Sequence, residues 1–421
     1  MKRFVRYTSI FLGTALVWGG ICYLASDHGW YYVPKAENAH TNSFVLAAKN
    51  EIEKGFKGSF AMAVLEKGKV KAEFFHSSGK KVDRNTLFQV ASLSKMVSAV
   101  GVMKLVEEEK IDLDVPVNQY LTRWQLPPSE FNNEEVSTRG LLSHTSGLTD
   151  GLGYSGFRSR DSVQTLEASL TNTLDADKGV SGQVKVGVAP NTEWRYSGGG
   201  YTLLQLLVEE RSQEIFTVYM TEKVLEPLGM VHSYYELPES AYSKLTDFYN
   251  ADGSEAPHFY YTSLAATSLY SSLADLETFF QEFTPKNNKL LKKGTLDEMQ
   301  KPIGYKMGVP TYGMGIFLFA SLDSGKYIIG HDGMSSPPIN TALRINPDTG
   351  DGIIFLETGD ADLATRLASD WVFVTTGKVD NLLYLMQLEK NLKIFGLGLL
   401  VLLLATMLIG IARKGRIRTG V

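Results

Sequence analysis

Two long apolar runs, one at each end of the chain, constrain what this sequence can fold into. The run 394–412 contains no charged residue and is rich in Leu, Ile and Val, and a basic segment follows it at 413–421. A helix of about 19 residues spans roughly 28 Å, close to the thickness of a bilayer core. The sequence therefore predicts a juxtamembrane segment over 377–393, a transmembrane helix over 394–412 and a basic cytoplasmic tail over 413–421.

The N-terminal run, 1–26, carries Lys2, Arg3 and Arg6 before an uncharged stretch. This pattern is typical of a signal peptide, with a cleavage point after Ala25, but the stretch is also long enough to remain as a membrane anchor. We favour the uncleaved anchor, and the cleaved signal remains the alternative. The positive-inside rule places both basic flanks in the cytoplasm. The middle of the chain is therefore expected on the outer face of the plasma (inner) membrane, in the periplasm or the extracellular space.

Composition excludes several classes of function. The formal net charge of -4 gives no basic surplus for binding nucleic acid. The single cysteine, Cys22, lies in the N-terminal apolar run, so the chain can form neither an intramolecular disulfide nor a thiolate metal cage. The motifs HExxH and GxSxG and the P-loop are missing. No metal and no cofactor are expected.

Strand patterns lie at both ends of the middle region, and helical patterns lie between them. Apolar, β-prone runs at 60–65 and 70–75 flank a Lys-Gly-Lys turn and predict a hairpin. Further predictions are strands at 313–319, 327–329, 342–345 and 353–356 and a helix at 361–374. We therefore expect an α/β fold: one antiparallel sheet built from both chain ends, with flanking helices and a mostly helical inserted subdomain.

The expected domain covers 58–376. The segment 27–57, which contains a linker at 35–41, connects it to the N-terminal run and holds its first residues.

The pattern Ser-x-x-Lys occurs three times, as Ser77 with Lys80, Ser78 with Lys81, and Ser92 with Lys95. The first two pairs lie in a Gly-Lys turn after a predicted strand, where they would be solvated. Ser92 instead opens a predicted helix, whose free backbone N–H groups and dipole favour developing negative charge. One helical turn places Lys95 beside Ser92, and burial would lower its pKa enough for it to act as a base. An ordinary helix N-cap would also explain Ser92, so this motif alone leaves catalysis open.

Six segments, in the same order along the chain, resemble those of the class C β-lactamase and DD-peptidase family of penicillin-recognising serine hydrolases. They are FQVASLSK at 88–95, GLLSHTSGL at 140–148, PNTEWRYSGGGY at 190–201, PLGM at 227–230, AATSLYS at 265–271 and GHDG at 330–333. The resemblance covers about 60–356 and implies a β-lactamase/transpeptidase-like fold.

The resemblance also implies roles for individual residues. Ser92 is expected to attack a carbonyl carbon and become acylated, while Lys95 and Tyr196 carry its proton to the leaving group. Which of those two is the base is left open. The backbone N–H groups of Ser92 and Met334 are expected to bind the oxyanion. His331 is expected to donate to a substrate carboxylate or carbonyl from across the cleft.

Three further positions complete the expected site. Gly333 is expected to leave room for substrate along the strand edge. His144 is interpreted as structural, satisfying loop backbone. The family's Tyr-x-Asn is replaced by Tyr196-Ser197-Gly198, so Gly198 lacks the amide that normally holds a substrate amide. This departure predicts ready hydrolysis of small activated esters and poor hydrolysis of β-lactams.

These observations predict a membrane-anchored serine hydrolase that acts through a Ser92 acyl-enzyme on an amide or ester of the cell envelope. A peptidoglycan-type peptide ending in D-alanine is the first expected substrate, and a small ester is the second. The alternative is a sensor or scaffold that binds or is acylated without efficient turnover. The expected partners are this substrate and the lipid bilayer, without nucleic acid; the sequence indicates no protein partner.

Overall fold

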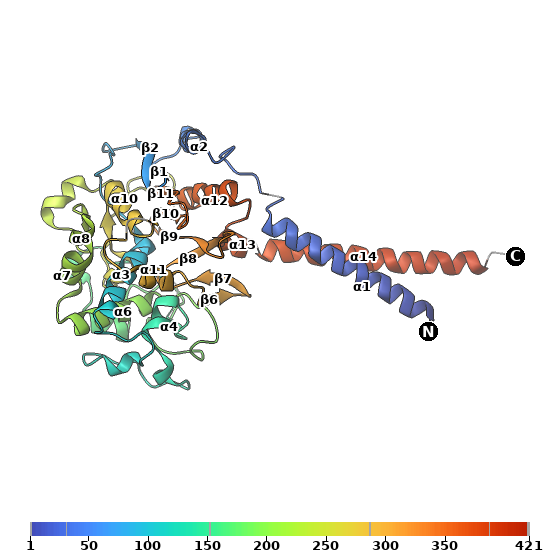
Figure 1. Cartoon of the computed structure of the whole chain (residues 1–421), viewed down its shortest axis with the longest axis horizontal. Coiled ribbons are helices and arrows are strands. Elements are labelled where there is room, and N and C mark those ends of the chain that lie inside the picture. Colours follow the sequence, from blue (N-terminus) through green and yellow to red (C-terminus); the bar gives the residue numbers. More distant parts are fainter. Residues whose placement is uncertain (1, 31, 151–152, 286–287, 387, 419–421) are drawn as a thin grey trace.

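A mixed α/β domain carries two long helices that leave it together on one side (Figure 1). The computed structural model describes the chain except for residues 1, 31, 151–152, 286–287, 387 and 419–421. The domain is built on an eight-stranded antiparallel sheet in the order β2-β1-β11-β10-β9-β8-β7-β6, and a smaller sheet has the order β3-β5-β4.

The bounds of the elements are as follows. The strands are β1 (Ser59–Glu66), β2 (Lys69–Ser77), β3 (Phe88–Gln89), β4 (Ser233–Tyr234), β5 (Tyr270–Ser271), β6 (Gly304–Lys306), β7 (Val309–Tyr312), β8 (Phe317–Ser321), β9 (Tyr327–Ser335), β10 (Ile339–Ile345) and β11 (Gly352–Thr358). The helices are α1 (Lys2–Asp27), α2 (Thr41–Glu53), α3 (Ser94–Glu107), α4 (Thr138–Ser143), α5 (Leu166–Thr171), α6 (Gly198–Ser212), α7 (Phe216–Met220), α8 (Glu226–Leu228), α9 (Leu264–Thr267), α10 (Leu273–Glu282), α11 (Lys293–Met299), α12 (Leu363–Thr376), α13 (Asn381–Met386) and α14 (Leu388–Arg418).

Strands from the two ends of the α/β domain meet in the main sheet. Strand β1 lies between β2 and β11, and its pairing with β11 runs from Ser59 opposite Thr358 to Leu65 opposite Gly352. The predicted hairpin is β1-β2, whose turn has positive φ at Lys67 and Gly68. The expectation of one antiparallel sheet built from both chain ends is confirmed.

The side chains of β1 alternate between two cores, one on each face of the sheet. Phe60, Met62 and Val64 belong to the core that includes residues of α2 and α12. Ala61 and Leu65 point to the other core, which contains α3, α6 and α10. Because both faces of the strand are covered, it carries apolar residues at successive positions rather than alternating with polar ones.

Two sequence expectations differ from the structure. The predicted strand 313–319 begins too early, because 313–316 form the turn between β7 and β8, in which the Gly313 N–H donates to the Ile316 carbonyl at 2.8 Å. Gly315 has φ +77° there, and a Cβ on it would overlap Ala99 of α3. Helix α2 was not predicted; it falls within the segment 27–57 and buries Phe44.

Helices α1 and α14 lie side by side and antiparallel, so both chain ends lie at the same end of the helix pair (Figure 1). The Trp18 indole N–H donates to the Phe395 carbonyl at 3.1 Å, and a Cβ on Gly398 would overlap the Trp18 ring. By length and composition, Val5–Ser26 and Lys390–Ile409 are apolar enough to cross a membrane.

Candidate active site

Ser92 lies in a single 3-10 turn, Ala91–Leu93, immediately before α3. The prediction that Ser92 opens the α-helix is therefore two residues off, because the helix begins at Ser94. Ala91 has φ +47°, a conformation that residues with a Cβ adopt infrequently. Two hydrogen bonds of Ser94 hold this turn in place: its Oγ donates to the Ala91 carbonyl at 2.6 Å and accepts from the Leu269 N–H at 3.0 Å.

Lys95 is buried in the first turn of α3 with its ammonium group beside the Ser92 hydroxyl. Its Nζ lies 3.1 Å from Ser92 Oγ and donates to the Ala266 carbonyl at 2.8 Å. Nζ also lies 4.9 Å from the centre of the Tyr196 ring and 5.6 Å from that of Tyr201. The Ala266 carbonyl was missed as a partner of Lys95, although its segment was one of the six that carried the family resemblance.

The charge on Lys95 is not matched by a contacting carboxylate. Among the described residues, no acidic side chain forms an ion pair with Lys95. Burial lowers the pKa of Lys95 to about 7. The charge of Asp150 acts in the opposite direction and raises that pKa. At neutral pH a large fraction of Lys95 is therefore neutral and able to accept a proton.

Asp150 is a site residue that the sequence analysis missed. Its carboxylate accepts from the Gly199 N–H at 2.7 Å and from the Ser197 hydroxyl, at the start of α6. It thereby holds the backbone immediately after Tyr196. The motif Thr-Asp after GLLSHTSGL was the only available signal, and nothing in the sequence linked it to Lys95.

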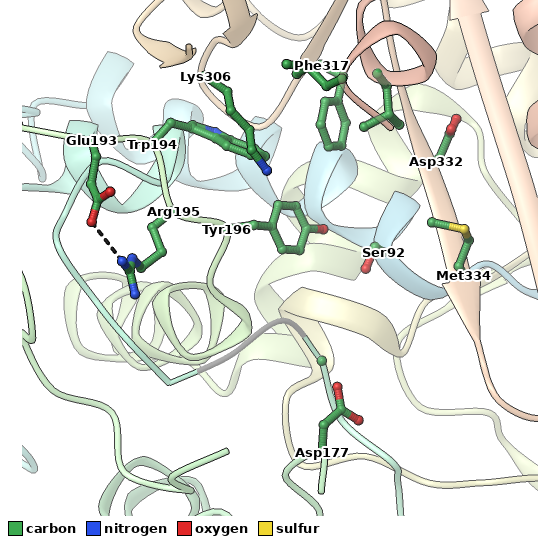
Figure 2. A pocket seen from close by; sticks show the side chains of 13 residues that line it. Ser92, Asp177, Glu193, Trp194, Arg195, Tyr196, Lys306, Phe317, Asp332 and Met334 are labelled. Carbon is green, nitrogen blue, oxygen red and sulfur yellow. Dashed lines mark hydrogen bonds and ion pairs between the residues drawn. The ribbon is translucent and has the colours of Figure 1, made fainter. Parts of the chain in front are cut away.

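Tyr196 points its hydroxyl toward Ser92 in the cleft (Figure 2). Burial raises the pKa of Tyr196, and interaction with the Ser92 hydroxyl opposes that rise. Its ring is held between two others: the His144 ring centre lies 4.2 Å away, and Phe317 stacks at 6.2 Å. The structure thus brings Ser92, Lys95 and Tyr196 together as expected from the sequence.

His144 has the structural role that was expected. Its Nδ1 accepts from the Ser197 backbone N–H at 3.1 Å, and burial lowers the pKa of His144 well below its ordinary value. The neutral ring therefore supports the Tyr196 segment without adding charge beside Lys95.

The structure does not place His331 as expected. The side chain is fully buried, with Nε2 2.8 Å from the Tyr312 hydroxyl and Nδ1 2.7 Å from the Asp332 carbonyl. Burial lowers the pKa of His331 to about 3, so the ring is neutral and its one N–H faces the Asp332 carbonyl. His331 therefore packs behind Tyr196 and Phe317, with no donor free for a substrate.

Gly333 also differs from expectation. A Cβ at this position would overlap the Val90 carbonyl and the Thr341 hydroxyl. The glycine makes room for the protein's own backbone just before Ser92, rather than for a substrate. This close approach brings β9 and the Ser92 turn together, and Met334 and Ser92 line the same cleft. The oxyanion role of their backbone N–H groups stays a prediction.

Gly198 begins α6, and the side chain of Tyr154 occupies the space beside it. A Cβ on Gly198 would lie 2.8 Å from Tyr154 Cε2. The Tyr154 hydroxyl hydrogen-bonds the Thr202 hydroxyl at 2.8 Å, which fixes the ring there. An aromatic ring thus fills the place next to Gly198, and the residue that fills it could not be foreseen from the sequence.

The cleft over Ser92 has a volume of about 650 Å³ (Figure 2). Its lining consists of Ser92, Gly153, Asp177, Glu193, Trp194, Arg195, Tyr196, Lys306, Phe317, Asp332, Met334, Leu382 and Leu385. The described residues contain no group of three His, Cys, Asp or Glu side chains placed to hold a metal ion. The arrangement is a buried lysine and a tyrosine around a serine hydroxyl at the floor of a partly apolar cleft, which suits acyl transfer.

Comparisons with known proteins agree with this geometry. A profile of the β-lactamase family matches residues 48–372. Protein flp of Staphylococcus aureus is 24% identical over 334 residues, which are 76% of this chain and 63% of that protein. Penicillin-binding protein 4* of Bacillus subtilis is 32% identical over 146 residues, covering 35% of this chain and 30% of its own length. The chain thus spans less than two thirds of these curated relatives.

Solved structures share the fold. The octameric penicillin-binding protein homologue from Pyrococcus abyssi has a TM-score of 0.65 at 23% identity, covering 80% of this chain and 77% of that one. D-alanine carboxypeptidase AmpC from Burkholderia cenocepacia has a TM-score of 0.61 at 19% identity, and the match covers 79% of this chain and 98% of that one. With the profile match over residues 48–372, which are most of the chain, the chain belongs to the β-lactamase family of serine hydrolases.

Proposed function

We propose that this protein is a membrane-anchored serine hydrolase that cleaves an ester or amide of the cell envelope through an acyl-enzyme on Ser92. The observation that carries the proposal is the contact of Lys95 Nζ with Ser92 Oγ at 3.1 Å, made by a buried lysine whose pKa falls to about 7. A neutral amine in that position accepts the hydroxyl proton as Oγ attacks the substrate carbonyl.

In the first half-reaction the Ser92 Oγ–carbonyl bond forms and the Oγ proton passes to Lys95. The Tyr196 hydroxyl, which points to the same serine (Figure 2), relays a proton from Lys95 to the departing alcohol or amine as the scissile bond breaks. In the second half-reaction water attacks the acyl carbon, its proton moves to the same pair, and Ser92 Oγ leaves with a proton. The two half-reactions release the leaving group and then the acid.

The test is mass spectrometry of the purified protein with a fluorophosphonate and with a penicillin, read over time. Ser92→Ala is expected to abolish labelling and turnover, whereas Ser77→Ala and Ser78→Ala, in the other two Ser-x-x-Lys pairs, leave both intact. Full activity in Ser92→Ala would exclude the mechanism. Labelling of Ser92 by a substrate without release of product would favour the alternative sensor.

We propose that esters are cleaved more readily than β-lactams. Tyr154 fills the space beside Gly198 and offers its hydroxyl to Thr202, so the substrate amide that an Asn would hold finds no side-chain amide there. An unsatisfied buried amide costs about 1–3 kcal/mol, or about 5- to 150-fold in rate. A D-alanyl peptide and a small ester remain the proposed substrates, and efficient cephalosporin turnover would contradict this preference.

We propose that both termini are cytoplasmic and that the domain, with expected bounds 58–376, lies outside. The antiparallel pairing of α1 and α14 supports a common side for the two termini, and the basic residues beside both apolar runs support the cytoplasm. Alkaline phosphatase fused after Thr376 should be active, and a fusion after Val421 should be inactive. A mature chain that starts at Ser26 would instead show a cleaved signal and a single anchor.

A further inference from the structure

The helix that joins the domain to the C-terminal apolar span forms part of the cleft wall. This helix, α13, falls in the segment 377–393 that the sequence suggested was only a connection. Its residues Leu382 and Leu385 line the same cleft as Ser92. The Asn381 side-chain amide donates to the Pro310 and Leu318 carbonyls, both at 3.0 Å. The helix is therefore docked on β7 and β8 rather than suspended between domain and membrane.

Buried charges also fix the start of α13. Asp380 precedes the helix, and its carboxylate accepts from the Leu382 N–H at 2.8 Å. The same carboxylate pairs with Arg344 at 3.2 Å, and Arg344 also pairs with Asp332 of β9, which lines the cleft. All three charged side chains are buried. This buried ion network holds α13 against the domain, so that Leu382 and Leu385 stay at the cleft.

The apolar span begins close to these leucines. Lys390, where the span starts, lies five positions after Leu385 in the chain. Five residues reach at most about 17 Å even when fully extended. The cleft wall formed by α13 is therefore within that distance of the start of the apolar span.

A second element on the same side is also apolar and exposed. The β6-β7 hairpin, which contributes Lys306 to the cleft, projects on the side of the domain from which α1 and α14 leave (Figure 1). Beside Lys306, Tyr305 is 48% exposed and Met307 is 70% exposed. Large apolar side chains on both sides of a cleft lysine are typical of a surface that meets the lipid interface.

We propose that this cleft takes its acyl substrate from the membrane: an amphiphile whose long apolar chain lies along Leu382 and Leu385 while its ester or amide carbonyl reaches Ser92. The inference rests on the proposed function and names the substrate class. The reaction is the acyl transfer described above, with the chain carried on the acyl group or on the leaving group. Each methylene that leaves water for this wall raises kcat/KM by up to about 4-fold.

The test uses the full chain in lipid nanodiscs with p-nitrophenyl esters of acyl chains from acetyl to octanoyl, and with a hexadecanoyl ester that stays in the bilayer. For the unaltered protein, kcat/KM is expected to rise with chain length, and the bilayer ester is expected to be cleaved. Leu382→Ser/Leu385→Ser should lower the octanoyl-to-acetyl ratio by about 10-fold. Leu46→Ser, an exposed leucine of α2 at 55%, is the matched control and should keep the ratio.

The outcomes separate this inference from the function on which it rests. A flat chain-length profile in the unaltered protein, with normal acetyl ester turnover, overturns the membrane substrate and leaves the hydrolase. An unchanged ratio in the double leucine variant overturns the role of α13. If that variant has a lowered unfolding midpoint, the single change Leu385→Ala is measured in its place. Failure of both the fluorophosphonate and the acetyl ester to react at Ser92 overturns the proposed function, and this inference with it.

Discussion

The domain buries two cations in opposite ways. Arg344 has no exposed surface, pairs with Asp332 and Asp380 and lies over the Phe319 ring, with its guanidinium carbon 3.4 Å from the ring centre. Lys95 is only 2% exposed, yet its ammonium group meets one hydroxyl, one carbonyl and the faces of aromatic rings.

The difference between them follows from the cost of burying charge. A buried ion whose partners are also buried stays charged, and removing one member leaves the others unpaired. A buried lysine without a contacting carboxylate instead loses its proton more easily, since burial lowers its pKa. Arg344 therefore stabilises the fold by joining β9 to the start of α13. Burial of Lys95 lowers the stability of the fold but provides a base for the reaction. The predictions below test this contrast.

The largest effect is expected from Lys95→Met. Activity should fall by at least about 10³-fold, because Ser92 loses its base. The unfolding free energy should rise at neutral pH. In the folded state Lys95 is neutral above about pH 7, whereas in the unfolded state it stays protonated up to its ordinary pKa of 10.5. Burial of Lys95 therefore lowers the unfolding free energy of the parent protein, and this loss shrinks as the pH rises from 7 to 10.5.

Enzyme assays and thermal unfolding in detergent, at several pH values, measure both effects. Lys104→Met, at the other end of α3, is the control and should change neither activity nor the pH dependence of unfolding. A Lys95→Met protein that is less stable than the parent at pH 7 would contradict the comparison.

Arg344→Met should have the largest effect on stability. It leaves Asp332 and Asp380 buried without their cation, which typically costs about 3–5 kcal/mol. Denaturant unfolding monitored by circular dichroism measures this loss. Arg366→Met, whose ion pairs with Asp360 and Asp362 are exposed, is the control and should lose less than about 1 kcal/mol. Equal losses in the two variants would mean that Arg344 is not the structural ion described here.

A smaller effect is expected from Asp150→Asn. The charge of Asp150 raises the pKa of Lys95, so its removal should move the acidic limb of the kcat/KM profile to lower pH. In the parent, that limb should lie near pH 7, where Lys95 loses its proton. Asp297→Asn, a partly exposed residue on α11, should leave the limb in place. A limb that moves to higher pH in Asp150→Asn would show that another group titrates.

The smallest effect is expected from Gly198→Ala, which places a methyl group 2.8 Å from Tyr154 and should cost about 1–3 kcal/mol in unfolding free energy. Gly294→Ala on α11, where a Cβ meets nothing within 4 Å, is the control and should be neutral or stabilising. In a double-mutant cycle with Tyr154→Ala the two losses should not add. Additive losses would show that Tyr154 does not restrict position 198.

The sheet could be predicted because its apolar strands are recognised from residue patterns within each strand. Ser92, Lys95 and Tyr196 were predicted from the resemblance of their segments to a known family, since the one-turn spacing of Ser92 and Lys95 alone left catalysis open. Sequence reasoning missed Asp150 and Tyr154, since their relation to Lys95 and Gly198 exists only after folding. It placed His331 wrongly because an isolated strand motif does not say how deeply the strand is covered.

The pairing of β1 with β11 has a consequence for how this chain is made. Ser59 and Thr358, whose backbone and side chain are hydrogen-bonded, lie 299 residues apart in sequence. Contacts between such distant residues fold slowly, because a long loop must close before any pairing energy is gained. During synthesis β1 has only β2 beside it until β11 has emerged. Its other edge then remains open to aggregation, and a chaperone that covers that edge during synthesis would raise the yield of folded enzyme.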